Sequence, residues 1–410
     1  MNIIAFRKLN PYHVSSASSN RFRSLIENLK AEGANIHLYI YGGYQSEEEF
    51  QKFKENGTFF NQIQYTYLLR HKNTNIWRRR LDKYILVHFR QFRFNKKINR
   101  LLQNSGETIF WLTDDVELQI AINRVPKKQT HCYFIEISEF LDIHTLHKGN
   151  AVQKALANKS QILFENQTYQ KLDAVALMTK TLFDHYQRNF LSGPRLLHLP
   201  MTVDLSRFEK TNYPNILALK KPYLVFTGVM NNVKDGVNIL IDAFAEIASE
   251  YADLNLYLFG PWDYDQPGHI QQIKKLNLEN RIFYKGLVDR DEIPNVLMNA
   301  KFLVMPRPDS KQAQGGFPTK LGEYLASGKP VCATTVGELP DYLTDGEHVF
   351  FSKPGDKQSF KESMLKLLQN EALSLEIGQN GKSVAYNNFN AKKQGKLLFD
   401  FLQSQRKINE

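Results

Sequence analysis

Strand-like and helical segments alternate along this chain in two separate series, and this alternation constrains the fold more than any other feature. In the first 200 residues, apolar runs such as NIIAF, NIHLYIY and TIFWLT are followed by amphipathic stretches such as SSNRFRSLIENLKAEG. The same order restarts at YLVFTG and continues to FKESMLKLLQN. Such alternation is typical of a parallel sheet covered by helices. The sequence therefore predicts an α/β fold.

A proline-containing segment at residues 199–222 separates the two series. The chain, at 410 residues, also exceeds the size at which one hydrophobic core stops growing. We expect two Rossmann-like, doubly wound parallel-sheet domains, at 1–203 and 204–385, that face each other across a cleft. A helix at 386–410 is expected to pack back on the first domain. Open α/β sheets bind ligands at the carboxyl ends of their strands, so function is expected in the cleft.

The composition suits a globular protein, with 42% hydrophobic and 23% charged residues. The apolar runs are shorter than a membrane-spanning helix requires, and the first residues do not resemble a secretory signal. Cys132 and Cys332 give neither a disulfide framework nor metal-ligand spacing. These observations predict a cytoplasmic protein without a metal site.

Residues 315–330, GGFPTKLGEYLASGKP, have the composition of a ligand-binding turn that leads into a helix. Gly315 and Gly316 allow the backbone to approach a ligand closely, and Pro318 suits the first turn of a helix. The free amide groups of such a turn favour an anion such as a diphosphate. Glu323, further along the helix, can accept hydrogen bonds from ribose hydroxyls. The alternative is a plain strand–turn–helix with a surface glutamate.

The longer segment GGFPTKLGEYLASGKPVCATTVGELPDYLTDG resembles the donor-binding signature of retaining, family-4-like glycosyltransferases (glycosyl transferases group 1), which have the GT-B fold. The stretches TGVMNNVKDGVNILIDAF, LNLYLFGPW and RIFYKGLVDRDEIPNVLMNAKFLVMP resemble neighbouring motifs of that family, in the same order. The resemblance is close over residues 175–365 and extends elsewhere only to the layout. It implies a nucleotide-diphosphate sugar as donor, transfer with retention, and no bound cofactor or metal.

The resemblance also implies roles for single residues. Glu323 matches the glutamate that holds the nucleotide ribose, and Lys234 matches the lysine that steadies the donor diphosphate. Gly228 matches the turn against which the donor lies. The turn whose amide groups face phosphate and sugar is matched by Gly316, Phe317, Pro318 and Thr319.

Two positions depart from the family's pattern. Gly315 stands where the family has the first glutamate of a pair, which contacts the donor sugar. Val229 and Met230 replace an arginine that binds phosphate. Arg307, after a predicted strand, can supply this charge, since a guanidinium suits bidentate phosphate binding. A solvated loop arginine is the alternative. We expect Lys234 and Arg307 to stabilise the departing phosphate.

The acceptor side is expected in the first domain, where serines replace a Gly-rich loop of the family. One serine of this loop caps the following helix, and the others, including Ser15 and Ser16, can face phosphate or acceptor. Arg21 lies in the first turn behind them. His13 is a further candidate, although a loop histidine is as readily solvated.

Two acids follow the predicted strand THCYFI. Glu136 and Glu139 can position the acceptor hydroxyl or take its proton, and Glu136 is the preferred candidate. The alternative is a helix-capping acid with a surface acid. Asp114 and Asp115 lack the spacing of metal-dependent transferases, so we expect them to form a helix N-cap.

Positive charge is concentrated in residues 70–100. This segment holds eleven Lys and Arg against one Asp, a charge of +10, while the whole chain has +11. Aromatic and aliphatic residues recur at helical spacing between the basic ones. The pattern predicts a helix that packs on the first domain and turns a basic face to an anionic membrane. A core helix with a basic outer face is the alternative, and nucleic-acid binding is not expected because no such motif accompanies the segment.

The sequence as a whole favours a glycosyltransferase that uses a nucleotide-diphosphate sugar and acts on a glycan or lipid-linked acceptor in bacterial surface polysaccharide assembly. Its expected place is the cytoplasm, peripheral to the inner face of the cell membrane. One alternative is a nucleotide-sugar epimerase, which needs no acceptor. The other is a degenerate transferase that binds nucleotide as a scaffold without transfer.

Overall fold

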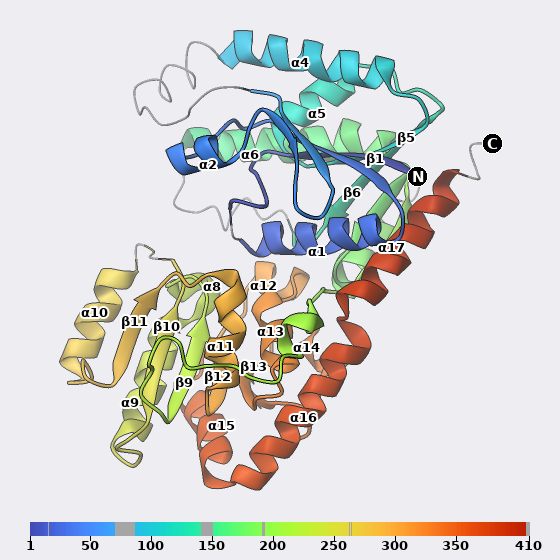
Figure 1. The fold of residues 1–410 in the computed structure, drawn as a ribbon. Coiled ribbons are helices and arrows are strands. Elements are labelled where there is room, and N and C mark those ends of the chain that lie inside the picture. The colour runs from blue at the N-terminus through green and yellow to red at the C-terminus, as the bar shows by residue number, and fades with distance from the viewer. Residues whose placement is uncertain are drawn as a thin grey trace. The chain divides into compact units, whose positions relative to one another are not determined.

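The computed structural model describes residues 1–14, 16–69, 87–140, 151–190, 193–261, 263 and 265–406. The chain forms two compact units, Met1–Leu199 with Lys392–Glu410, and Pro200–Ala391. Each unit is built on its own largely parallel sheet, and helices flank both sheets (Figure 1). The α/β fold predicted from the alternation of apolar runs is thus confirmed.

The first unit has, in its described part, an eight-stranded sheet with the order β3-β4-β2-β1-β5-β6-β7-β8. The edge strand β3 is antiparallel to β4, and the other pairs are parallel. The strands are β1 (Asn2–Arg7), β2 (Asn35–Ile40), β3 (Asn56–Thr58), β4 (Gln64–Tyr67), β5 (Thr108–Leu112), β6 (His131–Ile137), β7 (Ala174–Leu177) and β8 (Arg195–His198).

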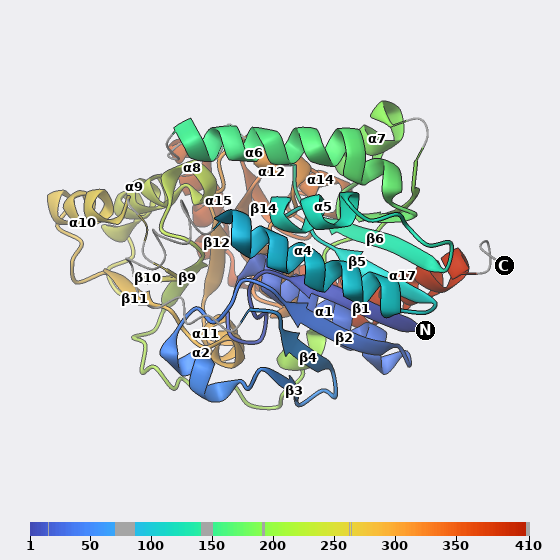
Figure 2. The ribbon, with the colours of Figure 1, turned by 90° about the horizontal axis from the view of Figure 1, so that it is seen from above.

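Helices cover both faces of this sheet, and each face has its own apolar core. They are α1 (Ala17–Ala31), α2 (Glu47–Lys52), α4 (Val87–Asn104), α5 (Val116–Asn123), α6 (Ala151–Leu163), α7 (Lys180–Asn189) and α17 (Ala391–Arg406). On one face, α1 packs together with α17, which contributes the fully buried Leu398 and Leu402. On the other face α4, α5 and α6 lie side by side (Figure 2). The first unit therefore completes one of its cores with the C-terminal helix.

The second unit has, in its described part, a six-stranded parallel sheet with the order β11-β10-β9-β12-β13-β14. Its strands are β9 (Tyr223–Thr227), β10 (Asn255–Phe259), β11 (Ile282–Gly286), β12 (Phe302–Met305), β13 (Val331–Thr334) and β14 (Phe350–Ser352). The order runs outward from β9 in one direction and then restarts on its other side at β12. This reversal is the topological switch point at which α/β sheets bind ligands.

Several helices of the second unit are only one or two turns long. The helices of this unit are α8 (Asn232–Asp235), α9 (Val237–Ala248), α10 (Gln266–Lys275), α11 (Ile293–Met298), α12 (Lys311–Gly315), α13 (Thr319–Ala326), α14 (Leu339–Tyr342), α15 (Lys357–Gln369) and α16 (Glu371–Asn388), with 3-10 turns η3 (Leu205–Phe208) and η4 (Arg290–Glu292). In the part of the chain that the structure describes, none of the helices is long and apolar enough to cross a membrane.

A buried tyrosine joins α13 to the end of β9. The backbone amide of Thr227 donates to the Tyr324 hydroxyl at 2.7 Å, and the Thr227 hydroxyl also lies 3.1 Å from it. Tyr324 is fully buried. This contact fixes the helix that follows the GGFPT turn against the strand that precedes Gly228.

Replacing Tyr324 by Phe is therefore expected to lower the free energy of unfolding by about 1–3 kcal/mol, because it leaves the Thr227 amide without its acceptor. Urea denaturation measures the change. Tyr386→Phe is the control, since Tyr386 is partly exposed and its hydroxyl lies 3.3 Å from Glu209 near the surface. Equal effects of the two substitutions would contradict a special role for the Tyr324 contact.

Candidate active site

The switch point of the second sheet lies between β9 and β12, which pair side by side. Gly228 directly follows β9, and Pro306 and Arg307 directly follow β12. After β9 the chain continues to α8, and after β12 it continues to α12. The carboxyl ends of β9 and β12 therefore carry the groups that a ligand would meet.

Gly228 is held in a close backbone contact with the neighbouring strand end. Its amide donates to the Phe259 carbonyl at 2.8 Å, and a Cβ on Gly260, whose φ is +146°, would overlap the Gly228 carbonyl oxygen. A Cβ on Gly228 itself would overlap the Lys320 ammonium. The close backbone approach therefore requires glycine at position 260, whereas a Cβ at position 228 would meet side-chain atoms of Lys320 and Phe226.

Lys320, in the first turn of α13, turns its side chain inward at this glycine. Its ammonium forms an ion pair with the buried Asp235 at the end of α8 and lies 4.4 Å from the centre of the Phe226 ring. Burial lowers the pKa of Lys320; Asp235 opposes this effect, whereas the positive charges of Arg307 and Lys234 add to it. Sequence reasoning had missed both members of this pair.

Arg307 is buried, with 7% of its surface exposed, so it is not a solvated loop arginine. Its carbonyl accepts a hydrogen bond from the Thr334 hydroxyl at 2.5 Å. Gly236, with φ of +66°, allows the junction of α8 and α9 to pass against the Pro306 carbonyl, which a Cβ would overlap. This approach brings α8, with the exposed Lys234, beside Arg307.

The GGFPT turn lies immediately before α13. Gly315 is the last residue of α12, and the Gly316 amide donates to the Gln312 carbonyl at 3.0 Å. Phe317 is buried against the rings of Tyr342 and Phe389. Pro318 occupies the N-cap position and Thr319 begins the helix. The structure thus places a helix N-terminus beside the switch point, as the sequence predicted for residues 318 and 319.

Glu323, one turn into α13, is held by an arginine from a distant segment. Arg207 of η3 donates to Glu323 Oε1 and also to the Arg290 carbonyl. The Glu323 side chain keeps 26% of its surface exposed, against 10% for Arg207. Arg207 was missed because it lies in DLSRF, a stretch that the sequence analysis treated as a connection between domains.

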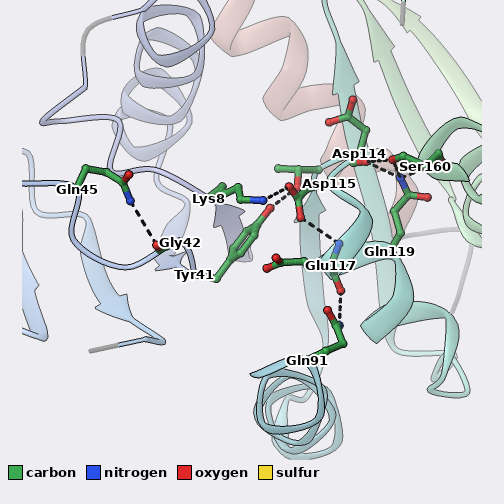
Figure 3. A network of polar contacts seen from close by, with 11 residues as sticks. Lys8, Tyr41, Gly42, Gln45, Gln91, Asp114, Asp115, Glu117, Gln119 and Ser160 are labelled. Carbon is green, nitrogen blue, oxygen red and sulfur yellow. Dashed lines mark hydrogen bonds and ion pairs between the residues drawn. The ribbon is translucent and has the colours of Figure 1, made fainter. Parts of the chain in front are cut away.

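The first sheet has a corresponding switch point between β1 and β5 (Figure 3). Lys8 follows β1 and pairs with Asp115 at 2.7 Å, and Tyr41 OH lies 2.9 Å from the Thr113 hydroxyl. Asp115 caps α5 by accepting from the Glu117 amide at 3.0 Å. These contacts join the carboxyl ends of β1, β2 and β5.

Asp114 does not share the capping role that the sequence analysis gave to both acids. Its carbonyl accepts from Gln119 and Ser160, while its carboxylate is directed away from the Lys8–Asp115 ion pair (Figure 3). Burial raises the pKa of Asp114, and the negative charges of Asp115 and Glu139 add to this effect, whereas Arg7 opposes it. The prediction was wrong for Asp114 because only the second acid has the backbone position of an N-cap.

Glu136, the preferred catalytic candidate, is paired with Arg21, a candidate for the acceptor or phosphate side. Arg21 Nε donates to Glu136 Oε1 at 2.7 Å and Arg21 Nη2 to the Leu199 carbonyl at 2.8 Å, with 2% of the arginine side chain exposed. Glu139 lies two residues beyond β6 and is exposed. Two positions predicted as separate candidates are thus in contact although they lie 115 positions apart in the sequence.

The remaining candidates of the first domain lie in local contacts. Ser16 caps α1 by accepting from the Ser19 amide at 3.1 Å, which makes it the predicted structural cap. His13 Nε2 lies 3.0 Å from the Ser46 hydroxyl, and its ring packs edge-on against Phe53. Ser15 lies outside the described residues. Within the described ranges, no group of three or more His, Cys, Asp and Glu side chains is arranged to hold a metal.

Comparison with known proteins finds a family that matches part of the chain. Residues 221–370 match the family described as glycosyl transferases group 1. The matched residues lie within the second unit. An uncharacterized glycosyltransferase of Methanocaldococcus jannaschii is 32% identical over 151 residues, which cover 36% of this chain and 38% of that protein. The match therefore spans less than half the length of this curated relative.

Solved structures show the fold. Sucrose-phosphate synthase from Thermosynechococcus elongatus aligns with a TM-score of 0.74 and 16% identity, covering 98% of both chains. Anabaena HepE, crystallised with UDP-glucose, aligns with a TM-score of 0.70 and 15% identity, covering 98% of this chain and all of that one. The GT-B fold predicted from the sequence is thus confirmed, and the predicted similarity to glycosyl transferases group 1 is found over residues 221–370.

The raised pKa of Asp114 has a consequence for stability. Its folded-state pKa lies above the ordinary value near 3.8, so the folded state binds the proton more tightly and loses stability as pH rises through this range. Asp114→Asn is expected to increase the free energy of unfolding at pH 7, and the gain should disappear below the ordinary pKa. Denaturant titrations at several pH values measure it.

Asp115→Ala is the matched control for this experiment. It removes the N-cap of α5 and is expected to destabilise the protein by about 0.5–2 kcal/mol. A loss of stability at pH 7 in Asp114→Asn as well would show that the carboxylate has a stabilising partner and would contradict the interpretation.

Proposed function

We propose that the protein transfers a sugar from a nucleotide-diphosphate sugar to an acceptor hydroxyl, with retention of the anomeric configuration. The observation that carries this proposal is the position of α13. Its N-terminus and Glu323 lie at the carboxyl ends of β9 and β12, with Lys234 and Arg307 beside them. The match of residues 221–370 to glycosyl transferases group 1 supports the same reaction class.

The donor side follows from the chemistry of these groups. The first amides of α13 and the two cations suit the diphosphate, whose negative charge increases as the sugar departs. Glu323 is the acceptor for ribose hydroxyls, and Arg207 holds its carboxylate in one orientation. Stabilisation of the leaving diphosphate by Lys234 and Arg307 does not call for a metal ion. UDP is the first nucleotide to test, because Anabaena HepE was crystallised with UDP-glucose.

The acceptor side is proposed at the switch point of the first sheet. Glu136, held by Arg21, is the candidate that orients the acceptor hydroxyl, and Asp114 is an additional carboxylate near the same strand ends. The acceptor that we propose is a glycan or lipid-linked glycan of a bacterial surface polysaccharide. The proposed place of the reaction is the cytoplasmic face of the cell membrane.

The donor site is tested with a thermal-shift panel of UDP, GDP, ADP and CMP. One diphosphate is expected to raise the melting temperature of the wild type, because it binds only the folded state. Glu323→Gln should weaken binding of that nucleotide about tenfold or more, since a charged hydrogen-bond acceptor is lost. Glu376→Gln, an exposed position of α16, is the control that should bind like the wild type.

The same nucleotide then decides between the reaction classes. Transfer from its sugar derivative to an added acceptor supports the proposal. Conversion of that donor without acceptor would favour the epimerase, and binding without any conversion would favour the scaffold. The absence of stabilisation by all four nucleotides would overturn the donor site.

We also propose that α4 contacts an anionic membrane. The helix packs on the first unit through the buried Phe94, Ile98 and Leu102. Its opposite side presents Phe92, with 65% of its surface exposed, among exposed basic residues, which are Arg93, Lys96, Lys97 and Arg100. An exposed aromatic ring within a basic face suits the interface of an anionic bilayer. Residues 70–86 of the predicted basic segment lie outside the described part of the chain.

Vesicle co-sedimentation tests this contact. Reversing Arg93, Lys96 and Arg100 to Glu is expected to abolish binding to vesicles with 30% phosphatidylserine, because each basic residue contributes about 1 kcal/mol near such a surface. Reversal of Lys357, Lys361 and Lys366 on α15 is the matched control and should leave binding intact. Equal binding by the α4 variant would contradict the proposal.

A further inference from the structure

Lys320 has no role in the site as sequence reasoning described it, yet its environment is unusual for a lysine on a short helix. Such a side chain ordinarily extends its ammonium into water. Here the Lys320 side chain has 17% of its surface exposed, and its partner Asp235 has 6%. Its ammonium lies over the Phe226 ring and beside Gly228. The charge is therefore held at the carboxyl end of β9.

We propose that Lys320, positioned by Asp235, binds the terminal phosphate of the nucleotide diphosphate. This inference rests on the proposed function and adds a phosphate-binding residue to its donor site. Asp235 does not contact the donor in this arrangement and acts only by holding the ammonium at Gly228.

The first support is geometric. Lys320 precedes Glu323 by three residues, so both belong to the same turn of α13, with Lys320 nearer the helix N-terminus. A nucleotide whose ribose reaches Glu323 and whose phosphates reach the N-terminus passes the Lys320 ammonium. Gly228 has no side chain to separate the ammonium from that path.

The second support is the balance of charge. The Lys320 ammonium is attracted by the carboxylate of Asp235 and repelled by the cations of Arg307 and Lys234. If the pair of Lys320 and Asp235 served folding alone, one acid would balance one base, and further cations close by would not be needed. Positive charges that crowd together in a partly buried place repel one another, and a ligand with two or more negative charges relieves this repulsion.

The test compares nucleoside monophosphates with diphosphates by calorimetry, using UMP and UDP, GMP and GDP, and AMP and ADP. Lys320→Met is expected to raise the Kd of the diphosphate that binds the wild type by about ten- to a hundredfold, and that of its monophosphate by less than about threefold. Lys329→Met is the matched control. Lys329 follows the other end of α13, burial also lowers its pKa, and both affinities should stay unchanged.

A second variant separates binding from folding, because Lys320→Met leaves Asp235 buried without its partner. The double variant Lys320→Met with Asp235→Asn removes both charges. It is expected to melt close to the wild type and still to lose the affinity for diphosphate.

The outcomes are distinct. Retained diphosphate affinity in the double variant, together with its loss in Glu323→Gln, would overturn the role of Lys320 and leave the proposed function standing. An equal loss of monophosphate and diphosphate affinity would indicate a structural role and would also overturn the inference. Failure of the wild type to bind any of the six nucleotides would overturn the proposed function and the inference with it.

Discussion

The reversal of strand order in each sheet is the constraint on which the rest of the structure depends. Where the order reverses, the connections that leave two neighbouring strands run in opposite directions, and the strand ends between them are left for side chains and ligands. In the second sheet this happens between β9 and β12, and in the first between β1 and β5. The glycine turn, Arg307, Lys8 and Asp115 all owe their position to it.

Buried or partly buried charges around the candidate sites are balanced by partners from distant parts of the chain. Arg21 meets Glu136, Asp235 meets Lys320 and Arg207 meets Glu323, at sequence separations of 115, 85 and 116 residues. Each pair removes a cost of burial that a single charge would carry. The pairs also link elements around the candidate sites, since α1 is joined to β6, α8 to α13 and η3 to α13. The same ion pairs therefore both neutralise the buried charges and orient the elements around the candidate sites.

Whether a feature could be predicted from the sequence depends on how far apart along the chain the interacting residues lie. Apolar periodicity is local, so the two series of strands and helices were predicted correctly. Capping is local too, and the helix that begins at Thr319 was expected from Pro318 before it. The partners of Glu323 and Glu136 could not be predicted, because no local pattern links residues more than a hundred positions apart. For Asp114 and Asp115, the backbone position decides which side chain caps α5. Because the two residues are adjacent and identical, the sequence does not indicate which of them has that position.

The path of the chain through the two units has a further consequence. The second unit, Pro200–Ala391, is one uninterrupted segment, whereas the first is made of Met1–Leu199 and the returning helix with Leu398 and Leu402 in its core. The second unit is in effect an insertion within the first. A fragment that stops before α17 would lack Leu398 and Leu402 from one core of the first unit, whereas the segment 200–391 contains its own complete sheet. Exchange of the second unit between related chains would thus need two junctions, one on each side of the insertion.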